Sequence, residues 1–542
     1  MKVLLATAGA VFALSAPAAV AAPNVVLILT DDQRWDTLSA MPTVRSELVG
    51  KGVNFSNAFV VNPLCCPSRA SILTGRYSHS TRVYRNGSFS LFDDDSTIAT
   101  WLRAAGYETA FLGKYLNSYR GTYVPPGWSR WQAFTPANVA NFFDYELNVD
   151  GTISAFGSAP EDYSTDVLAT RAEEFIRLSA RPFLLVFAPY APHAPATPAP
   201  RHSTAFPGLA PWRPASYDEA DVSDKPDYVK STGLIPDPSE LDGFRRSQFR
   251  SLLAVDEAVE RTLDALEDTG RLEDTVIIYT SDNGFLWGEH RLIGKQAPYE
   301  ESIRVPLVVR YDAEIAAPRT EGRIVANIDI APTIAHLAGI APRRTNGRTL
   351  RPLLRGSPTG WRKQLLVEAT RTGPNTRVPG YCAVRGKRFA YVVYETREEE
   401  LYDLRRDPAQ LRNRVRDPGM HEQRNRLRSL ALALCDPPPP GVSLRWICTR
   451  TGTPGPDVIR GGAGLDAICA RAGRDRVFGG RGDDRLTGGP GRDTIFAGPG
   501  DDRMFVRDGA KDAITCGPGR DRVTADKRDV VGDDCEWVGR PG

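Results

Sequence analysis

The sequence has no excess of charge of either sign, few methionines and, beyond its first residues, no long hydrophobic run. Its 68 Lys and Arg residues are balanced by 66 Asp and Glu residues, so the net charge of +2 gives no electrostatic reason to expect a nucleic-acid binder. Only 4 residues are Met, the mean hydropathy is −0.32, and no segment after the N-terminus has the length of a transmembrane helix. These features exclude a polytopic membrane protein.

The N-terminus has the pattern of an export signal. A basic start at Lys2 is followed by the apolar stretch 3–14 and by small residues at 18–22, where a signal peptidase would cut. This pattern favours a signal peptide over residues 1–22 rather than a buried helix, and therefore a secreted protein in which disulfides are allowed. The remaining chain is long enough for two to four domains, and its apolar content of 41% argues against wholesale disorder.

Short apolar runs alternate with amphipathic stretches between residues 24 and about 341. Continuous aliphatic runs predict buried strands at 24–30, 182–189, 275–280 and 305–310. Helices are predicted at 96–105, 162–178, 239–266 and 329–337, with Ser96 and Asp162 as N-caps of the first two. Alternation of this kind predicts an α/β domain over residues 23–362, with a mainly parallel sheet between helices.

The pattern changes after residue 363. Short β-like runs at 365–369, 381–384 and 389–394, followed by a helical stretch at 421–434, predict a small antiparallel sheet with a closing helix over 363–435. Four consecutive prolines at 437–440 then predict a stiff linker over 436–451.

A nine-residue unit repeats six times without a gap between residues 452 and 505, and again at 516–524 after a one-residue slip. The fourth position is always Gly, the sixth Asp and the eighth apolar, and a flexible tail would have no reason to keep this phase. The glycines allow tight turns, the apolar side chains would stack inside, and the carboxylates suit Ca²⁺. The repeat resembles the RTX-type calcium-binding nonapeptide, which implies a parallel β-roll over 452–542. Arginines beside the carboxylates, such as Arg474 and Arg476, would compete with calcium. The candidate calcium ligands are Asp457, Asp466, Asp475, Asp484, Asp493 and Asp502.

Two predicted strands end in acidic or amide pairs. The first runs into Asp31 and Asp32, and the strand at 275–280 is followed by Asp282 and Asn283. Because the carboxyl ends of parallel strands share one edge, these four side chains predict a site for Ca²⁺ or Mg²⁺ there. The alternative is that each pair only caps the helix that follows its strand.

The run CCPSRASILTG begins at Cys65. Pro67 suits a first helical turn and Gly75 a helix end, so Cys65 is placed at a helix N-terminus, which favours an anion. Arg69, one turn later, would add a guanidinium clamp for a tetrahedral oxyanion. The alternative is that Cys65 and Cys66 are structural or form disulfides elsewhere.

This run matches the pattern C-x-P-S-R-x-x-x-L-T-G, and the chain therefore resembles the sulfatases, in which the first Cys is oxidised to formylglycine. The resemblance extends over residues 24–413 and includes GKYLN from Gly113 and VANIDIAPTI from Val325, which resemble the N-acetylglucosamine-6-sulfatase branch. It implies an alkaline-phosphatase-like fold, a sulfuric ester hydrolase and a sulfated small molecule or carbohydrate as substrate. It also implies a formylglycine-generating enzyme as a maturation partner.

The resemblance also implies roles for matching residues. Modified Cys65 would hydrate to a gem-diol that attacks sulfur, and its second hydroxyl would later expel the sulfate. His193 or Lys295 would protonate the departing alcohol. The residues implied to hold one Ca²⁺ or Mg²⁺ are Asp31, Asp32, Cys65, Asp282 and Asn283. Those implied to balance charge on the sulfate oxygens are Arg69, Lys114 and Lys295.

One position departs from the family pattern. Many sulfatases carry a His two residues after the lysine that matches Lys114, and here that residue is Leu116. The base for the elimination step is therefore open, since Asn117 is a poor base. His79 and His290 lie near the motifs and are candidates for substrate contact, whereas the other histidines outside the motifs are expected at the surface or in packing.

The cysteine count agrees with this interpretation. If Cys65 is modified, seven cysteines remain, and Cys66 is the expected unpaired one. The other six allow three disulfides, in about 15 possible connectivities that stay open: Cys382, Cys435, Cys448, Cys469, Cys516 and Cys535.

Two other functions stay open. Sulfate and phosphate esters share a geometry and differ mainly in charge, so a phosphodiesterase or phosphonate monoester hydrolase of the same superfamily is one alternative. The other is a catalytically inactive, calcium-dependent surface-binding protein that uses the α/β domain as a scaffold.

Overall fold

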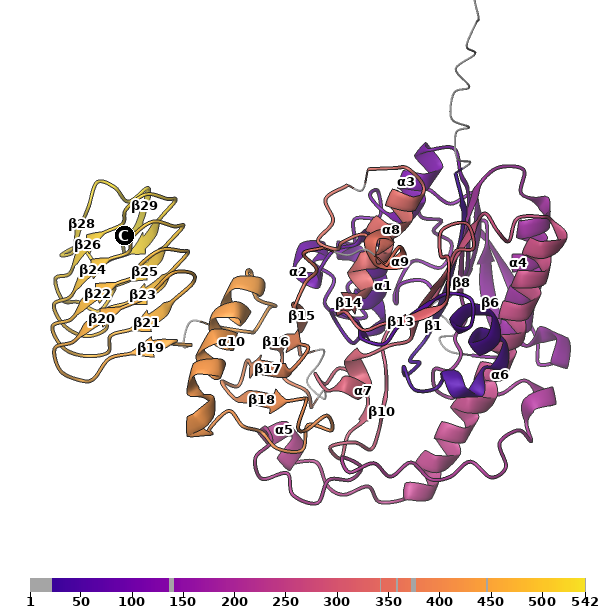
Figure 1. Ribbon diagram of the computed structural model, residues 1–542, viewed down its shortest axis with the longest axis horizontal. Helices are drawn as coiled ribbons and strands as arrows, with labels where there is room; N and C mark the ends of the chain where they lie inside the picture. The colour runs from indigo at the N-terminus through magenta and orange to yellow at the C-terminus, as the bar shows by residue number, and fades with distance from the viewer. Residues whose placement is uncertain are drawn as a thin grey trace, which may run out of the picture.

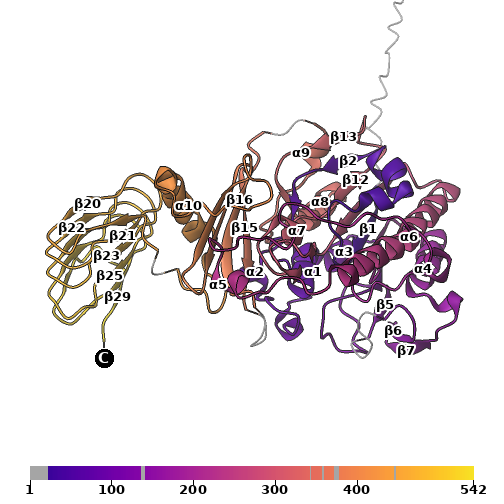
Figure 2. The same ribbon diagram turned by 90° about the horizontal axis from the view of Figure 1, so that it is seen from below.

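The structure is a computed structural model, which describes residues 22–135, 141–341, 343–356, 359–371, 377–444 and 447–541. The predicted signal peptide lies outside this part of the chain apart from Ala22. A large α/β domain is followed by a small sheet, the helix α10 and a β-roll, in that spatial order (Figures 1 and 2). The predicted fold class is confirmed. No helix of the described residues is long and apolar enough to cross a membrane.

A ten-stranded mixed sheet forms the centre of the α/β domain. Strands β9, β1, β8, β4 and β5 run parallel, and β12 pairs antiparallel with both β9 and β2. Across the sheet the strands are β13 (Arg319–Glu321), β2 (Val53–Phe55), β12 (Leu307–Arg310), β9 (Thr275–Ser281), β1 (Asn24–Thr30), β8 (Phe183–Ala188), β4 (Glu108–Gly113), β5 (Arg130–Phe134), β6 (Tyr145–Val149) and β7 (Thr152–Phe156).

Helices cover both faces of this sheet, which explains the uninterrupted hydrophobic run of β1. Val26 and Ile28 belong to one apolar core together with α4 (Ser164–Leu178) and α6 (Pro238–Asp268). Val25 and its alternate neighbours belong to a second core with α1 (Cys65–Thr74), α3 (Ile98–Ala104) and α8 (Ile330–Leu337). Successive side chains of a strand point to opposite faces, so each face of β1 supports a different helical layer.

Both predicted N-caps are wrong. Helix α3 begins after Thr97, which forms a capping box with Thr100, whereas the Ser96 hydroxyl accepts a hydrogen bond from the Trp101 indole. Helix α4 begins after Tyr163, because Asp162 ends a preceding 3-10 turn. In both cases the helix begins one or two residues later than its polar sequence signal.

The small sheet lies between the α/β domain and α10 (His421–Leu434) (Figure 2). Its four antiparallel strands include β18, which follows the three predicted runs. The strands in order are β15 (Gln364–Ala369), β16 (Tyr381–Gly386), β17 (Phe389–Tyr394) and β18 (Glu399–Asp403). A disulfide between Cys382 and Cys435 ties β16 to the end of α10. In the linker, Val442, Leu444 and Ile447 are buried in the same apolar cluster as α10 and the start of the roll.

The β-roll consists of two parallel sheets formed by alternate repeats. The apolar residue at position eight points inward, so that Val477, Leu486 and Ile495 are fully buried between the sheets. Disulfides join Cys448 to Cys469 and Cys516 to Cys535, a connectivity that the sequence left open, and Cys66 is free, as predicted. One sheet contains β19 (Arg450–Thr451), β21 (Ala467–Cys469), β23 (Arg485–Thr487), β25 (Arg503–Phe505), β27 (Arg522–Thr524) and β29 (Trp537–Gly539). The other contains β20 (Val458–Arg460), β22 (Arg476–Phe478), β24 (Thr494–Phe496), β26 (Ala513–Thr515) and β28 (Val530–Val531).

Short elements complete the α/β domain. The strand β3 (Ala58–Phe59) pairs with β14 (Val325–Ala326), and β10 (Leu286–Trp287) pairs with β11 (Ile293–Gly294). The short helices are α2 (Ser78–Thr81), α5 (Asp227–Lys230), α7 (Glu300–Ile303) and α9 (Arg351–Leu354).

Candidate active site

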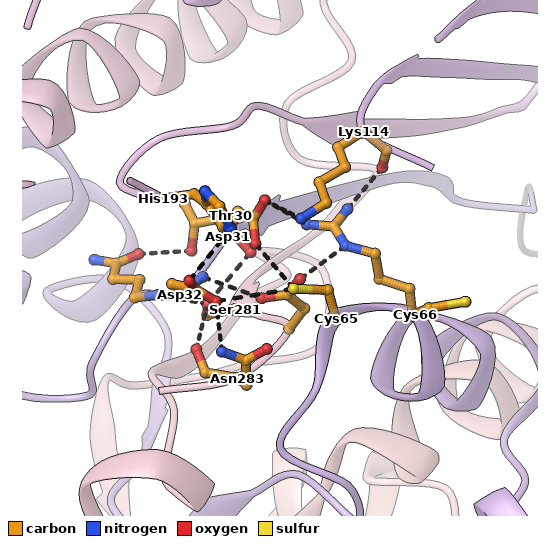
Figure 3. Close-up of polar contacts among 12 residues, drawn as sticks. Thr30, Asp31, Asp32, Cys65, Cys66, Lys114, His193, Ser281 and Asn283 are labelled. Carbon is orange, nitrogen blue, oxygen red and sulfur yellow. Dashed lines mark hydrogen bonds and ion pairs between the residues drawn. The ribbon is translucent and has the colours of Figure 1, made fainter. Parts of the chain in front are cut away.

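The two acidic strand ends meet at one edge of the sheet. Strands β1 and β9 are parallel neighbours in which Thr30 lies opposite Ser281, so the residues that follow them are adjacent. The backbone amide of Asp282 donates to the Thr30 carbonyl at 3.1 Å, and the Asp32 amide donates to Asp282 Oδ1 at 3.1 Å. The predicted metal ligands of the two strand ends are thus brought together, and Figure 3 shows three of them, Asp31, Asp32 and Asn283.

Cys65 is the first residue of α1, and its side chain points toward the carboxylates of Asp31 and Asp32. Its Sγ lies 3.6 Å from Asp31 Oδ1, 4.0 Å from Asp32 Oδ1 and 2.8 Å from Lys295 Nζ, and the residue is 1% exposed. Burial raises the pKa of the Cys65 thiol to about 12, although Lys114 and Lys295 lower it in part. The unmodified thiol therefore stays protonated at neutral pH and is a poor nucleophile.

Arg69 lies one turn after Cys65 on the same helix. Its Nε donates to Asp282 Oδ2 at 2.8 Å and its Nη1 donates to the Lys114 carbonyl at 2.6 Å. The buried Nη2 has no hydrogen-bond partner among the described residues and lies 3.9 Å from Asp31 Oδ2. Two nitrogens of the guanidinium group are therefore held by hydrogen bonds, and Nη2 is available to donate to an oxygen atom of a ligand.

Two lysines neutralise the aspartates. Lys114 follows β4 and its ammonium contacts Asp31, whereas Lys295 follows β11 and its Nζ lies 2.5 Å from Asp32 Oδ1. Burial alone would raise the pKa of Asp31, but Lys114, His193 and Arg69 hold it at about 2. Burial likewise opposes ionisation of Asp32, and Lys295 and His193 lower the pKa of this carboxyl. Both aspartates are therefore anionic near neutral pH.

His193 lies in the loop that follows β8. Its Nε2 is 3.7 Å from Asp32 Oδ2, and its Nδ1 is 2.6 Å from the Ala194 carbonyl. If the ring is neutral, the contact with the carbonyl places the proton on Nδ1 and leaves Nε2 toward the site. The side chain is 23% exposed, more than the side chains of Lys114 and Lys295, so it lies on the solvent side of the group.

The residues present fit a hard divalent cation. The Oδ1 of Asn283 is buried and has no hydrogen-bond partner in the described part of the chain, although its Nδ2 donates to Asp32 Oδ1 at 2.6 Å. Ligand atoms of Asp31, Asp32, Cys65 and His193 all lie within 4.8 Å of one another. Carboxylate and amide oxygens are the ligands of Ca²⁺ and Mg²⁺, so Asp31, Asp32, Asp282 and Asn283 have the right chemistry.

A supporting network beneath the aspartates was not predicted. The Gln33 amide donates to Ser281 Oγ at 2.9 Å, while Gln33 Oε1 accepts hydrogen bonds from Thr30 at 2.8 Å and from Tyr279 at 2.6 Å. These bonds fix the turn that carries Asp31 and Asp32 relative to β9. The only signal in the sequence is that Gln33 directly follows the two aspartates.

The remaining candidates lie apart from this centre. Leu116 is 2% exposed, belongs to the apolar core that includes α1, and has no side-chain group that can accept a proton. His290 is fully buried, pairs with Glu219 at 2.7 Å and stacks on Tyr299. His79 pairs with Glu368 at 3.0 Å. The structure thus gives His290 and His79 carboxylate partners, where the sequence suggested substrate contact.

The aspartates of the β-roll form two columns. The Oδ1 atoms of Asp475, Asp484, Asp493 and Asp502 each accept the backbone amide of the residue 18 positions earlier, at 2.7–2.8 Å. Their Oδ2 atoms are buried without a hydrogen-bond partner among the described residues. Burial raises the pKa of Asp484 to about 7 and that of Asp493 to about 6. Asp466 lies 3.3 Å from Arg450, which precedes the repeats, whereas Arg474 and Arg476 form no ion pair with a described residue.

Comparison with known proteins gives three matching families. Residues 23–340 match Sulfatase, residues 288–434 match N-sulphoglucosamine sulphohydrolase, C-terminal, and residues 451–477 and 478–510 match the RTX calcium-binding nonapeptide repeat.

Individual relatives agree with these matches. The chain is 37% identical to human N-acetylglucosamine-6-sulfatase over 385 residues, which cover 66% of this chain and 69% of that protein. It is 39% identical to a putative extracellular sulfatase Sulf-1 homolog of Caenorhabditis elegans over 61% of its length, but spans only about half (49%) of that relative.

Solved structures share the fold. One, determined in complex with its substrate D-glucosamine-2-N,6-O-disulfate, superimposes with a TM-score of 0.68 at 26% identity, over 77% of this chain and 99% of the other. A phosphonate monoester hydrolase of Agrobacterium radiobacter superimposes with a TM-score of 0.64 at 24% identity, over 76% and 95%.

Proposed function

The chain belongs to the sulfatase family, and from this premise we propose that it is an exported sulfuric ester hydrolase that acts on a sulfated sugar through a formylglycine made from Cys65. One observation carries the proposal. Cys65, at the start of a helix, lies against Asp31 and Asp32, and three cations surround the same point. Such a centre combines a position for a nucleophile with charges that match a tetrahedral oxyanion.

Maturation and metal binding complete the centre. Conversion of Cys65 exchanges the thiol sulfur for a carbonyl oxygen, which needs an oxidising, formylglycine-generating enzyme as partner. The hydrated aldehyde would supply the attacking hydroxyl, and a Ca²⁺ or Mg²⁺ ion held by Asp31, Asp32, Asp282 and Asn283 would supply Lewis acidity. Hydrogen bonds fix these ligands before the substrate arrives. The Gln33 amide binds Ser281 Oγ and thereby holds the backbone after Asp32, and Arg69 Nε holds the side chain of Asp282.

The cations of the chain would hold the sulfate group. Arg69 offers its unpartnered Nη2, while the ammonium groups of Lys114 and Lys295 flank the nucleophile position from two different loops. Because Arg69 and Lys114 are buried and the Lys295 side chain is only 15% exposed, their attraction for a developing negative charge is screened little by water. Their positions also favour attack along one direction, with the leaving alcohol on the solvent side near His193.

Release of the alcohol needs a proton donor. His193 has one nitrogen fixed by the Ala194 carbonyl, so a protonated ring would present its Nε2 hydrogen to the leaving oxygen. Lys295 is the second candidate, because its Nζ already contacts Cys65 Sγ at 2.8 Å. With Leu116 buried, the base for the final elimination comes from these same residues or from solvent.

We assign the β-roll to calcium binding. The unpartnered Oδ2 atoms of Asp484 in one column and Asp493 in the other, together with the raised pKa of each carboxyl, indicate two columns of carboxylates that lack a counter-charge. Ca²⁺ supplies that charge and accepts oxygen ligands from the turns. The match to the RTX repeat supports the same ion.

Mass spectrometry of the peptide that contains Cys65 tests the enzymatic proposal. The natively exported protein should carry an aldehyde at position 65, and Cys65→Ala should abolish hydrolysis of a sulfated N-acetylglucosamine. The matched control is Cys66→Ala, which removes the adjacent buried thiol and should keep the activity. A native, active protein with an unmodified Cys65 would refute the mechanism. A faster reaction with a phosphonate monoester than with the sulfate ester would favour the alternative hydrolase.

A further inference from the structure

A cavity lies at the end of the small sheet where β15 begins and β16 turns into β17. It has a volume of about 420 Å³ and is formed by the segment 322–324 before β14, the start of β15, the hairpin between β16 and β17, and α10. Its lining includes no Asp or Glu, and every lining residue lies in the described part of the chain. The basic residues that line it are Arg323, Arg362, Lys363, Lys387, Arg388 and Arg426.

Three of these cations are held in place by carboxylates outside the lining. Arg323 pairs with Glu321 at 2.7 Å, Arg362 with Asp329 at 2.5 Å and Arg388 with Asp403 at 2.9 Å. These pairs fix the guanidinium groups. They also compensate three of the six positive charges.

The other three cations have no such partner. Lys363, Lys387 and Arg426 are exposed, and none forms an ion pair with a described residue. The cavity therefore collects three uncompensated positive charges from a strand start, a hairpin and a helix that are distant in sequence. A concave surface lined by one sign of charge concentrates ligands of the opposite sign.

The cavity is separate from the active site. Tyr381, at the first position of β16, donates to the carbonyl of Gln296, the residue after Lys295, at 2.8 Å. Gly386, at the last position of β16, lines the cavity. Four residues of strand lie between Tyr381 and Gly386, which are about 17 Å apart along β16.

We propose that this cationic cavity binds sulfate groups of a polysulfated glycan chain, at a distance from the ester that is cleaved. Arg and Lys side chains match sulfate oxygens, and the half-buried Phe389 adds apolar surface for a sugar ring. The choice of a sulfated glycan over other polyanions rests on the proposed function. A chain held here and at the active site would gain affinity from two attachment points.

Binding to immobilised dextran sulfate tests the proposal, with uncharged dextran as a blank. The variant Lys363→Gln, Lys387→Gln, Arg426→Gln changes only exposed, unpaired side chains. We expect its affinity to fall at least tenfold at low salt, and the slope of log K against log salt to become shallower by about two. The matched control is Arg103→Gln, Arg181→Gln, Arg343→Gln, which removes three exposed arginines that form no ion pair with a described residue and should bind nearly as the parent does.

The outcomes separate this inference from the proposed function. Hydrolysis of a monosulfated sugar reports the proposed function and should be equal in the parent and both triple variants, whereas KM for a polysulfated chain should rise about tenfold in the cavity variant alone. If neither the parent nor the two triple variants hydrolysed the sulfated sugar, but the cavity variant alone bound dextran sulfate more weakly, only the catalytic proposal would be refuted. Unchanged binding in the cavity variant, an equal loss in the control, or equal cavity-dependent binding of polyphosphate of matched charge would overturn the cavity assignment.

Discussion

Replacement of Arg69 by Lys tests whether the geometry of the guanidinium fork matters beyond its charge. Arg69 donates through Nε to Asp282 and through Nη1 to the Lys114 carbonyl, and keeps Nη2 free. A lysine ammonium keeps the positive charge, but it does not reach the carboxylate, the carbonyl and a substrate oxygen at once.

Two magnitudes follow from this geometry. Loss of one buried charge-assisted hydrogen bond should lower the free energy of unfolding by about 1.5–3 kcal/mol. Loss of the contact that Nη2 makes only as charge develops on the sulfate should lower kcat by about 10²–10³-fold. The assays are denaturant unfolding and turnover of a sulfated N-acetylglucosamine, both at neutral pH.

Arg385→Lys is the matched control. Arg385 is also buried and pairs with Glu300 at 2.6 Å, but it lies on β16 away from Cys65. We expect this variant to lose a similar amount of stability and to keep kcat within about threefold. If Arg69→Lys keeps kcat in the same range, or if both variants lose kcat equally, then the unpartnered Nη2 is not reserved for substrate and the reasoning is wrong.

Two further predictions concern buried carboxyls. Burial and the nearby Glu289 raise the pKa of Glu301 to about 7, so the folded state prefers the neutral acid and stability falls as pH rises from about 4.5 through 7. Glu301→Gln should therefore raise the unfolding free energy by about 2–3 kcal/mol at pH 8 but not at pH 4, and thermal unfolding with an equal effect at both values would contradict this sign. In the β-roll, removal of Ca²⁺ with a chelator at pH 8 should lower the melting temperature of the roll in the full-length protein, because Asp484 and Asp493 are then ionised without a counter-charge. A transition that is insensitive to both chelator and added Ca²⁺ would contradict calcium binding.

Patterns with a local physical cause were predictable from the sequence. The strand β1 was placed at its residues because a sheet covered on both faces needs a continuous aliphatic run. The β-roll was predictable because the nine-residue units follow one another without a gap, and units with Gly and Asp at fixed positions stack in one register. Helix starts were less predictable. A local capping box between Thr97 and Thr100 starts α3, whereas α4 starts after Tyr163, which is fully buried and donates to the Thr197 carbonyl.

By itself, the sequence determined which residue types form the candidate sites: Cys65 at a helix start, the acidic ends of two strands, and a repeat with an aspartate at a fixed position of each nine-residue unit. Only the tertiary structure decided how these parts meet. The register of β1 against β9 joins Asp32 to Asp282, and the packing of α1 leaves one arm of Arg69 free. The cationic cavity is also a product of tertiary structure alone, since Lys363, Lys387 and Arg426 share no motif. The reason is physical: propensity and periodicity act over a few residues, whereas distances between side chains depend on how separate elements pack.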